Sequence, residues 1–81
     1  MQATTVERVR MVLAEVLQVP SRMLASPGRL DEMAPIDSLS LAELAAALDD
    51  EFGIAIDGER LTTGLSVADV VALVEAARPA R

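Results

Sequence analysis

Three segments of the chain repeat apolar residues at the three- and four-residue spacing of an α-helix with one buried face. The first segment starts at Thr4, where a capping box with Glu7 is predicted, and Pro20 ends it. The last segment starts at Ser66, which forms a second capping pattern with Asp69. The inward positions of these two segments are Val6, Val9, Val12, Leu13, Val16, Leu17, Val67, Val70, Val71 and Val74, with Leu73 at the edge.

The middle segment, residues 38–52, carries the most regular apolar stripe. Its members are Leu41, Leu44, Ala45, Leu48 and Phe52. Asp37 or Ser38 can cap the start of this helix, and Ser40 offers a further capping pattern with Glu43. Gly53 supplies a stop directly after it, because glycine adopts the left-handed conformation that closes many helices.

The connections between these helices differ in length. Residues 18–36 hold three prolines and are predicted to form a long loop, with a short helical turn near Ser21–Leu24. Leu24, Leu30 and Met33 are expected to attach this loop to the core. Residues 57–63 are predicted to form a short helix with Leu61 as its anchor. The fold class is therefore all-α: a small four-helix bundle, with three long helices and one short one, in a single domain over residues 1–81.

The composition is consistent with such a bundle. Hydrophobic residues make up 52% of the chain but aromatic residues only 1%, so aliphatic side chains must build the core. The length of 81 residues is enough for one core, and without Cys or His neither a disulfide nor a zinc site can staple it. No apolar run approaches the roughly 20 residues that span a bilayer, and no signal-peptide pattern is present. We expect a cytoplasmic monomer that does not bind membranes.

Charge is distributed unevenly around a net value of −6. Residues 1–30 hold four Arg against two Glu, whereas residues 31–81 hold eleven acids against three Arg. An acidic surface repels nucleic-acid phosphates and attracts basic proteins, so a protein partner is favoured over a nucleic acid. The chain also contains no Lys, His or Cys, which are the commonest catalytic bases and nucleophiles. The sequence therefore predicts a protein that is not an enzyme.

Ser38 lies at the predicted start of the middle helix, where unpaired N–H groups and the helix dipole favour negative charge. A serine at this position is most often a plain N-cap. Nucleophilic catalysis would need a base, usually His, and the chain has none. The position would instead suit a serine that another enzyme modifies with an anionic group. Position alone favours the plain cap, so the neighbouring residues must decide.

Acidic residues follow Ser38 along the same helix. Glu43 and Asp50 are seven residues apart and share a face, which Asp49 and Glu51 flank. Such residues can form a solvated polar face, an acid/base pair in a pocket, or a docking surface for basic partners. A calcium loop beginning at Asp49 is excluded because Gly53 occupies the position of the third acidic ligand. No metal site is predicted.

Two nearby segments form one extended pattern. Residues 36–44 read Ile-Asp-Ser-Leu-Ser-Leu-Ala-Glu-Leu, and residues 47–56 read Ala-Leu-Asp-Asp-Glu-Phe-Gly-Ile-Ala-Ile. This extended pattern resembles the signature of acyl carrier proteins, and the resemblance covers the whole chain in the order and spacing of its predicted elements. It implies that Ser38 receives 4′-phosphopantetheine from coenzyme A. It also implies that Asp37 helps to position the transferase reaction and that Leu39 is an exposed apolar contact beside the arm.

By the same resemblance, Glu43, Asp49 and Asp50 would meet Arg and Lys side chains of partner enzymes. Ser40 and Ala46 occupy two further docking positions and depart from the pattern of fatty-acid carriers, which often have an acidic residue and a methionine there. These two departures are expected to alter partner choice, since a rim charge mainly affects association rate and selectivity.

The function implied is that of a carrier, which holds acyl intermediates as thioesters on the arm and presents them to other enzymes. The expected partners are a phosphopantetheinyl transferase, acyl-loading and condensing enzymes (an acyltransferase, a ketosynthase or an adenylating ligase), and the acyl cargo. A polyketide or related specialised pathway is the preferred setting, and a fatty-acid or aminoacyl carrier is the alternative. An unmodified helical adaptor that binds proteins through its acidic face is the alternative from another class.

Overall fold

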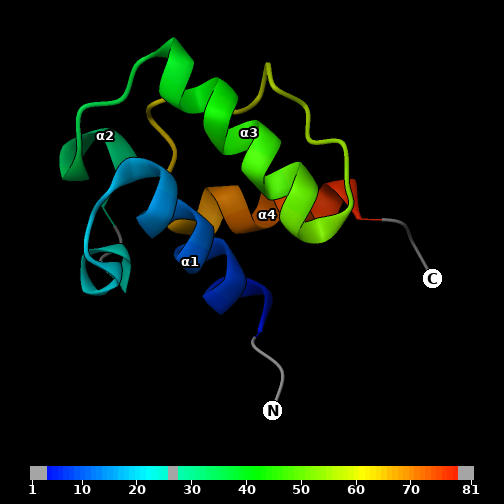
Figure 1. The fold of residues 1–81 in the computed structure, drawn as a ribbon, viewed down its shortest axis with the longest axis horizontal. Helices are drawn as coiled ribbons and strands as arrows, with labels where there is room; N and C mark the ends of the chain where they lie inside the picture. The colour runs from blue at the N-terminus through cyan, green and yellow to red at the C-terminus, as the bar shows by residue number, and fades with distance from the viewer. Residues whose placement is uncertain (1–3, 26–27, 79–81) are drawn as a thin grey trace.

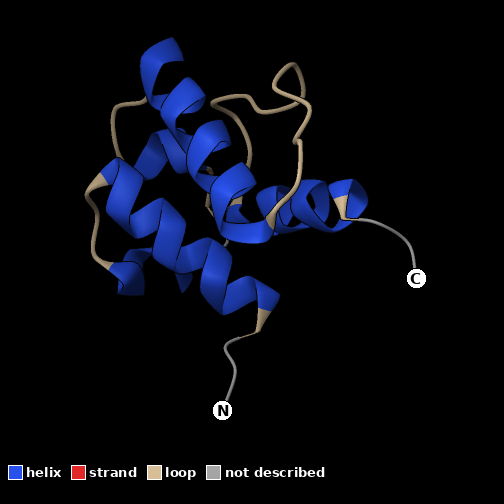
Figure 2. Cartoon of the chain, turned by 45° about the vertical axis from the view of Figure 1, so that its right-hand side comes forward, coloured by secondary structure: helices blue, strands red, loops and turns tan. Residues whose placement is uncertain are grey.

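A computed structural model describes residues 4–25 and 28–78 of the chain (Figure 1). Its elements are α1 (Thr5–Leu17), the 3-10 helix η1 (Ser21–Ala25), α2 (Leu30–Met33), α3 (Ser38–Phe52) and α4 (Val67–Ala77). Figure 2 shows helices joined by loops, and the described residues contain no strand beyond an isolated bridge between Arg29 and Ser66. The predicted all-α class, with three long helices and one short one, is confirmed.

Side-chain caps fix the starts of α1 and α4, as predicted. The Thr4 hydroxyl accepts a hydrogen bond from the Glu7 N–H at 3.1 Å, and the Glu7 carboxylate accepts one from the Thr4 N–H at 3.4 Å. Ser66 and Asp69 form the same reciprocal pair at 3.2 and 3.0 Å. Each box pairs backbone donors that the first turn of a helix leaves without a partner.

Left-handed residues close α1 and α3. Gly53 follows α3 with φ 64°, a conformation that costs glycine little. Gln18 plays the same part after α1 with φ 56°, and its N–H donates to the Ala14 carbonyl. Pro20 was predicted to end the first helix, but the turn at Gln18 already ends it at Leu17. The first helix does end in this region, as predicted, but Gln18 ends it and Pro20 does not.

The short helix lies in a different place from the one predicted. Residues 57–63 form turns, in which Arg60 donates to the Asp57 carbonyl at 3.0 Å and Leu61 to the Gly58 carbonyl at 3.3 Å. Glycine and threonine are weak helix formers, so this segment does not propagate a helix beyond those turns. The fourth helix is α2, inside the long segment expected to be a loop. Leu61 is nevertheless buried, and the predicted turn near Ser21–Leu24 is confirmed as η1.

Figure 1 shows α1 and α3 running side by side and α4 crossing α3, and the three long helices enclose one aliphatic core. The buried side chains are Val9, Val12, Leu13, Leu24, Leu30, Leu44, Leu48, Leu61, Val67, Val70, Val71, Leu73 and Val74. Leu24 and Leu30 attach the long segment between α1 and α3 to this core, as predicted. Two positions were assigned wrongly: Val6 is 38% exposed in the first turn of α1, and Leu73 is buried although it was expected at the edge.

The single aromatic residue, Phe52, joins the far end of α3 to both terminal helices. The guanidinium of Arg8 lies 4.4 Å from the centre of the Phe52 ring, and that of Arg78 lies 5.9 Å from it. Arg8 also pairs with the Glu51 carboxylate at 3.0 Å and donates to the Glu51 carbonyl at 2.7 Å. A cation at a helix C-terminus is favourable, because the carbonyl groups there carry partial negative charge. α3 is thus held at the end away from Ser38.

Within residues 4–25 and 28–78, no helix combines the length and the apolar character that crossing a membrane requires.

Candidate functional site

Ser38 is the first residue of α3 and is exposed to solvent. In the described part of the chain its hydroxyl makes no hydrogen bond, so it is available to an external reagent. The backbone N–H groups of this first turn point toward the same end of the helix and favour negative charge beside them. The chain provides no His, Lys or Cys that could act as a base for the hydroxyl. This arrangement suits a serine that is acted upon by another protein.

Asp37, immediately before Ser38, is the N-cap of α3. Its Oδ1 accepts a hydrogen bond from the Ser40 N–H at 2.8 Å. Of the two residues that the sequence left open as caps, Asp37 is therefore the one that caps the helix. The Ser38 hydroxyl takes no part in the cap. The hydrogen bond from the Ser40 N–H holds the pKa of the Asp37 carboxyl below its ordinary value. The capping pattern predicted for Ser40 and Glu43 does not form, because Ser40 already lies inside the helix.

The depressed pKa of Asp37 predicts a specific pH dependence of stability. The charged cap stabilises the folded chain above the ordinary pKa of an aspartate, and this contribution disappears as pH falls through the lower pKa of the folded state. Asp37→Asn keeps a capping side chain but removes the charge. We expect the variant to have a lower urea midpoint than the wild-type chain at neutral pH, followed by circular dichroism. The two midpoints should converge as the solution is acidified, and a constant difference at every pH would contradict the role of the charge.

Four of the predicted site residues form one exposed face of α3. Leu39, Glu43, Ala46 and Asp50 follow each other at spacings of four, three and four residues, which places them on one side of a helix. All four are exposed, and Leu39 has 67% of its surface open to solvent. We call this set the α3 stripe. It begins one residue after Ser38 and combines an apolar start with two carboxylates along its length.

The other two predicted docking residues, Ser40 and Asp49, lie off the α3 stripe and are half-buried. Asp49 Oδ1 accepts a hydrogen bond from the Ile56 N–H at 2.8 Å, which fixes the chain after Gly53 against the end of α3. The sequence did not reveal this contact. The only sequence signal for this contact is a carboxylate in the last turn of a helix that a glycine ends, and many helices share that pattern.

The acidic residues of this region do not gather into a metal site. In residues 4–25 and 28–78, no three acidic side chains lie close enough together to hold a metal ion. Glu51, which flanks the acidic face in the sequence, pairs with Arg8 of α1. The carboxylates of Glu43 and Asp50 make no ion pair within the described residues, so they remain available to cations of another molecule.

Comparison with known proteins points to one family. The family model of the phosphopantetheine attachment site matches residues 7–74. An acyl carrier protein of Saccharopolyspora erythraea is 37% identical over 67 residues, which cover 83% of this chain and 70% of that protein. One of Helicobacter hepaticus is 38% identical over 72 residues, covering 89% and 95% of the two chains. A meromycolate extension acyl carrier protein of Mycolicibacterium smegmatis is 33% identical over 78 residues, covering 90% and 78%.

Proposed function

This chain belongs to the acyl carrier protein family, and we propose that Ser38 is the residue that bears its 4′-phosphopantetheine arm. Members of this family carry acyl groups for other enzymes and are not catalysts themselves. The observation that supports Ser38 is its exposed hydroxyl at the first residue of α3, one position before the α3 stripe. When bound, the arm supplies a thiol that holds acyl groups as thioesters.

The residues around Ser38 fit an anionic phosphodiester. The first turn of α3 offers unpaired N–H groups to a phosphate, and such a helix start stabilises negative charge by about 0.3–1 kcal/mol. Because Asp37 caps through Ser40, its carboxylate points at the backbone and leaves the Ser38 side chain exposed. Asp37 is proposed to position the transferase reaction, and Leu39 to offer an apolar contact beside the arm.

The proposed mechanism is tethering. A cargo attached to Ser38 by a flexible arm is delivered to each partner at a high effective concentration, of millimolar order for a short flexible link. The protein's contribution is to expose the attachment point and to dock each partner enzyme beside it. This requires a rigid helix with a recognisable surface, which the caps of α3 and the α3 stripe would provide.

The α3 stripe is the proposed docking surface for the modifying enzyme and the biosynthetic partners. Glu43 and Asp50 would meet basic side chains, Leu39 would fill an apolar site, and Ala46 would permit close approach. Ser40 and Asp49 are proposed to contribute at the edge of this surface, although the Asp49 carboxylate is partly committed to Ile56. Exposed complementary charges act mainly on the rate of association and on the choice of partner.

Reversing the two charges of the α3 stripe should slow modification. We expect the double variant Glu43→Lys/Asp50→Lys to lower the kcat/KM of a phosphopantetheinyl transferase about tenfold at low salt, since charge steering changes association rates by this order or more. The difference should shrink at high ionic strength, where exposed charges are screened. The initial rate of incorporation from coenzyme A is the measurement.

The matched control is Glu15→Lys/Glu75→Lys, which makes the same change of net charge at exposed positions on α1 and α4. Its rate should stay within about twofold of the wild-type chain, because these carboxylates lie outside the proposed surface. An equal loss in both double variants would show that net charge, and not the α3 stripe, guides the enzyme.

The proposed setting is a polyketide or related specialised pathway in the cytoplasm, with an acyltransferase, a ketosynthase or an adenylating ligase as partners. Ser40 and Ala46 support this choice, because they replace residues that are common in fatty-acid carriers. A fatty-acid or aminoacyl carrier is the alternative. The similarity to a meromycolate extension carrier, at 33% identity, does not favour either setting over the other.

One assay separates a carrier from an unmodified adaptor. The full chain is incubated with coenzyme A and a phosphopantetheinyl transferase of broad specificity, and its intact mass is measured. We expect every chain to gain one phosphopantetheine group. An adaptor that works only through its acidic face would gain none, and that result would overturn the proposal.

A further inference from the structure

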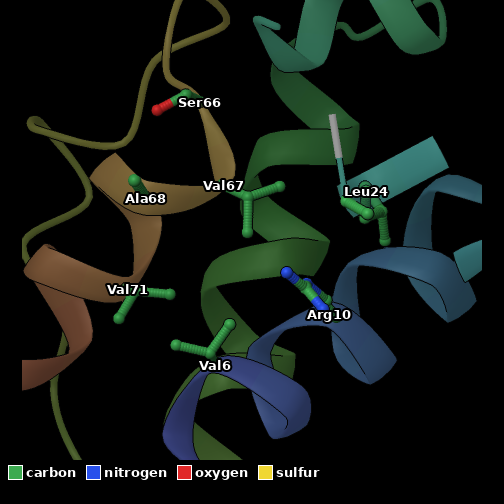
Figure 3. A pocket seen from close by; sticks show the side chains of 8 residues that line it. Val6, Arg10, Leu24, Ser66, Val67, Ala68 and Val71 are labelled. Atoms are coloured by element: carbon green, nitrogen blue, oxygen red, sulfur yellow. The ribbon is translucent and has the colours of Figure 1, made fainter. Parts of the chain in front are cut away.

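A half-open cavity of about 320 Å³ lies between α1, η1 and α4. Apolar side chains form most of its wall: Val6 comes from α1, Leu24 from η1, and Val67 and Val71 from α4 (Figure 3). None of its lining residues belongs to α3. The cavity is therefore distinct from Ser38 and from the α3 stripe.

Arg10 brings a positive charge into this apolar cavity. Figure 3 shows its guanidinium group reaching from α1 toward the middle of the ring of lining side chains. The Arg10 Nε is buried and has no hydrogen-bond partner in the described part of the chain. A guanidinium stays protonated in proteins, so neutralisation cannot relieve this charge.

The described residues of the cavity wall offer no internal partner for that charge. Among them there is no carboxylate, and Ser66 is the only polar side chain besides Arg10. The Ser66 hydroxyl already accepts a hydrogen bond from the Asp69 N–H, and the Asp69 carboxylate accepts one from the Ser66 N–H. The Arg10 side chain is only partly buried, so its guanidinium can still meet an anion that enters the cavity from outside the chain.

The shape and chemistry of the cavity restrict what this group can be. Its volume is at the lower end of the range for small-molecule pockets, which is about 300–1,000 Å³. One guanidinium can pair with a carboxylate or a phosphate through two parallel hydrogen bonds. Because the described lining residues include no second cation, a singly charged carboxylate matches the cavity better than a doubly charged phosphate. The apolar wall would exclude a fully hydrophilic anion, because nothing there replaces its water.

We propose that this cavity binds a small aliphatic carboxylate. Its carboxylate pairs with the Arg10 guanidinium, and its hydrocarbon chain lies against Leu24, Val67 and Val71. Binding gives the guanidinium an anionic partner and removes apolar surface from water in the same step. The site does not use Ser38, so it is independent of the carrier function proposed above.

The test is a titration of the ¹⁵N-labelled full chain, without the phosphopantetheine arm, followed by amide chemical shifts. Hexanoate is the probe, hexan-1-ol has a comparable chain without the charge, and acetate has the charge without the chain. We expect saturable shifts with hexanoate, concentrated in residues 6–10, 24–25 and 66–71. The two comparison compounds should each bind about tenfold more weakly or worse, since each lacks one of the two interactions.

Variants connect the binding to Arg10. Arg10→Gln should weaken hexanoate binding about tenfold, while Arg22→Gln, which removes a charge from an exposed position of η1, should change it by less than about twofold. If Arg10→Gln does not fold, Ala68→Leu serves instead, because Ala68 is exposed at the wall and a larger side chain there fills the cavity. That variant should also abolish the shifts.

Three results would overturn the proposal. The first is an absence of saturable shifts with hexanoate. The second is equal binding of hexan-1-ol, which would show an apolar cavity in which Arg10 takes no part. The third is hexanoate binding that survives the substitution at Arg10 or the filling of the cavity at Ala68. None of these outcomes depends on whether Ser38 can be modified.

Discussion

Ser38→Ala is expected to abolish incorporation of phosphopantetheine completely. The substitution removes the hydroxyl to which the phosphopantetheine would be attached, and no neighbouring side chain offers a nucleophile in the same place. The fold should be unaffected, because Asp37 caps the helix and the Ser38 hydroxyl makes no hydrogen bond in the described residues. Intact mass after incubation with coenzyme A and a phosphopantetheinyl transferase is the measurement.

Ser40→Ala is the matched control, since it removes a hydroxyl from the same turn of the same helix. It should take up one group per chain, although more slowly if Ser40 contributes to docking. Full incorporation into Ser38→Ala would place the attachment site elsewhere. Incorporation that fails in both variants would instead indicate that the transferase recognises the first turn as a whole.

The largest expected effect on stability comes from Leu48→Ala. Leu48 is fully buried between α3 and the rest of the core, and truncating a leucine in such a position costs about 2–5 kcal/mol. A chain of this length has a total stability of about 4–12 kcal/mol, so the variant should lose a substantial share of its stability. Urea denaturation followed by the helical circular dichroism signal measures the loss.

Leu39→Ala makes the same chemical change on the same helix at a position that is 67% exposed. Its free energy of unfolding should stay within about 0.5 kcal/mol of the wild-type chain. Its rate of modification should fall, because Leu39 is proposed to contact the transferase. The two leucines therefore separate stability from recognition, and a large destabilisation by Leu39→Ala would contradict the exposed position of that side chain.

The long helices could be predicted from sequence because two local signals coincide in each of them. A stripe of apolar residues at helical spacing marks the buried face, and a capping residue marks the start. Thr4, Asp37 and Ser66 all cap in the structure, and the stripes of α1, α3 and α4 build the core. Gly53 ends α3 for the same kind of local reason.

The short elements could not be predicted in this way. Residues 57–63 have an apolar anchor in Leu61, yet Gly58 and the threonines give too little helix propensity to extend the turns there. Leu30 begins a helix instead, where its N–H donates to the Leu65 carbonyl at 2.8 Å across the fold. A contact between residues so far apart in sequence is set by tertiary packing and leaves no local pattern.

The candidate site was predictable to different degrees along its length. Ser38 and the order of the acidic residues follow from the sequence pattern, and helical spacing already placed Glu43 and Asp50 on one face. The half-buried position of Asp49 and its hydrogen bond to Ile56 depend on how the chain turns after α3. From the sequence, Arg10 could be assigned only a contribution to the net charge. Its place in a cavity depends on how α1, η1 and α4 pack together.

The position of Phe52 gives the molecule an internal reporter. Its ring is the only aromatic group in the chain, and two guanidinium groups from the first and last helices lie over it. Its proton resonances are therefore free of overlap with other rings and sense the approach of three helices at one point. Since Phe52 is at the opposite end of α3 from Ser38, a spectroscopist can follow whether loading or docking at one end loosens the other, without attaching any label.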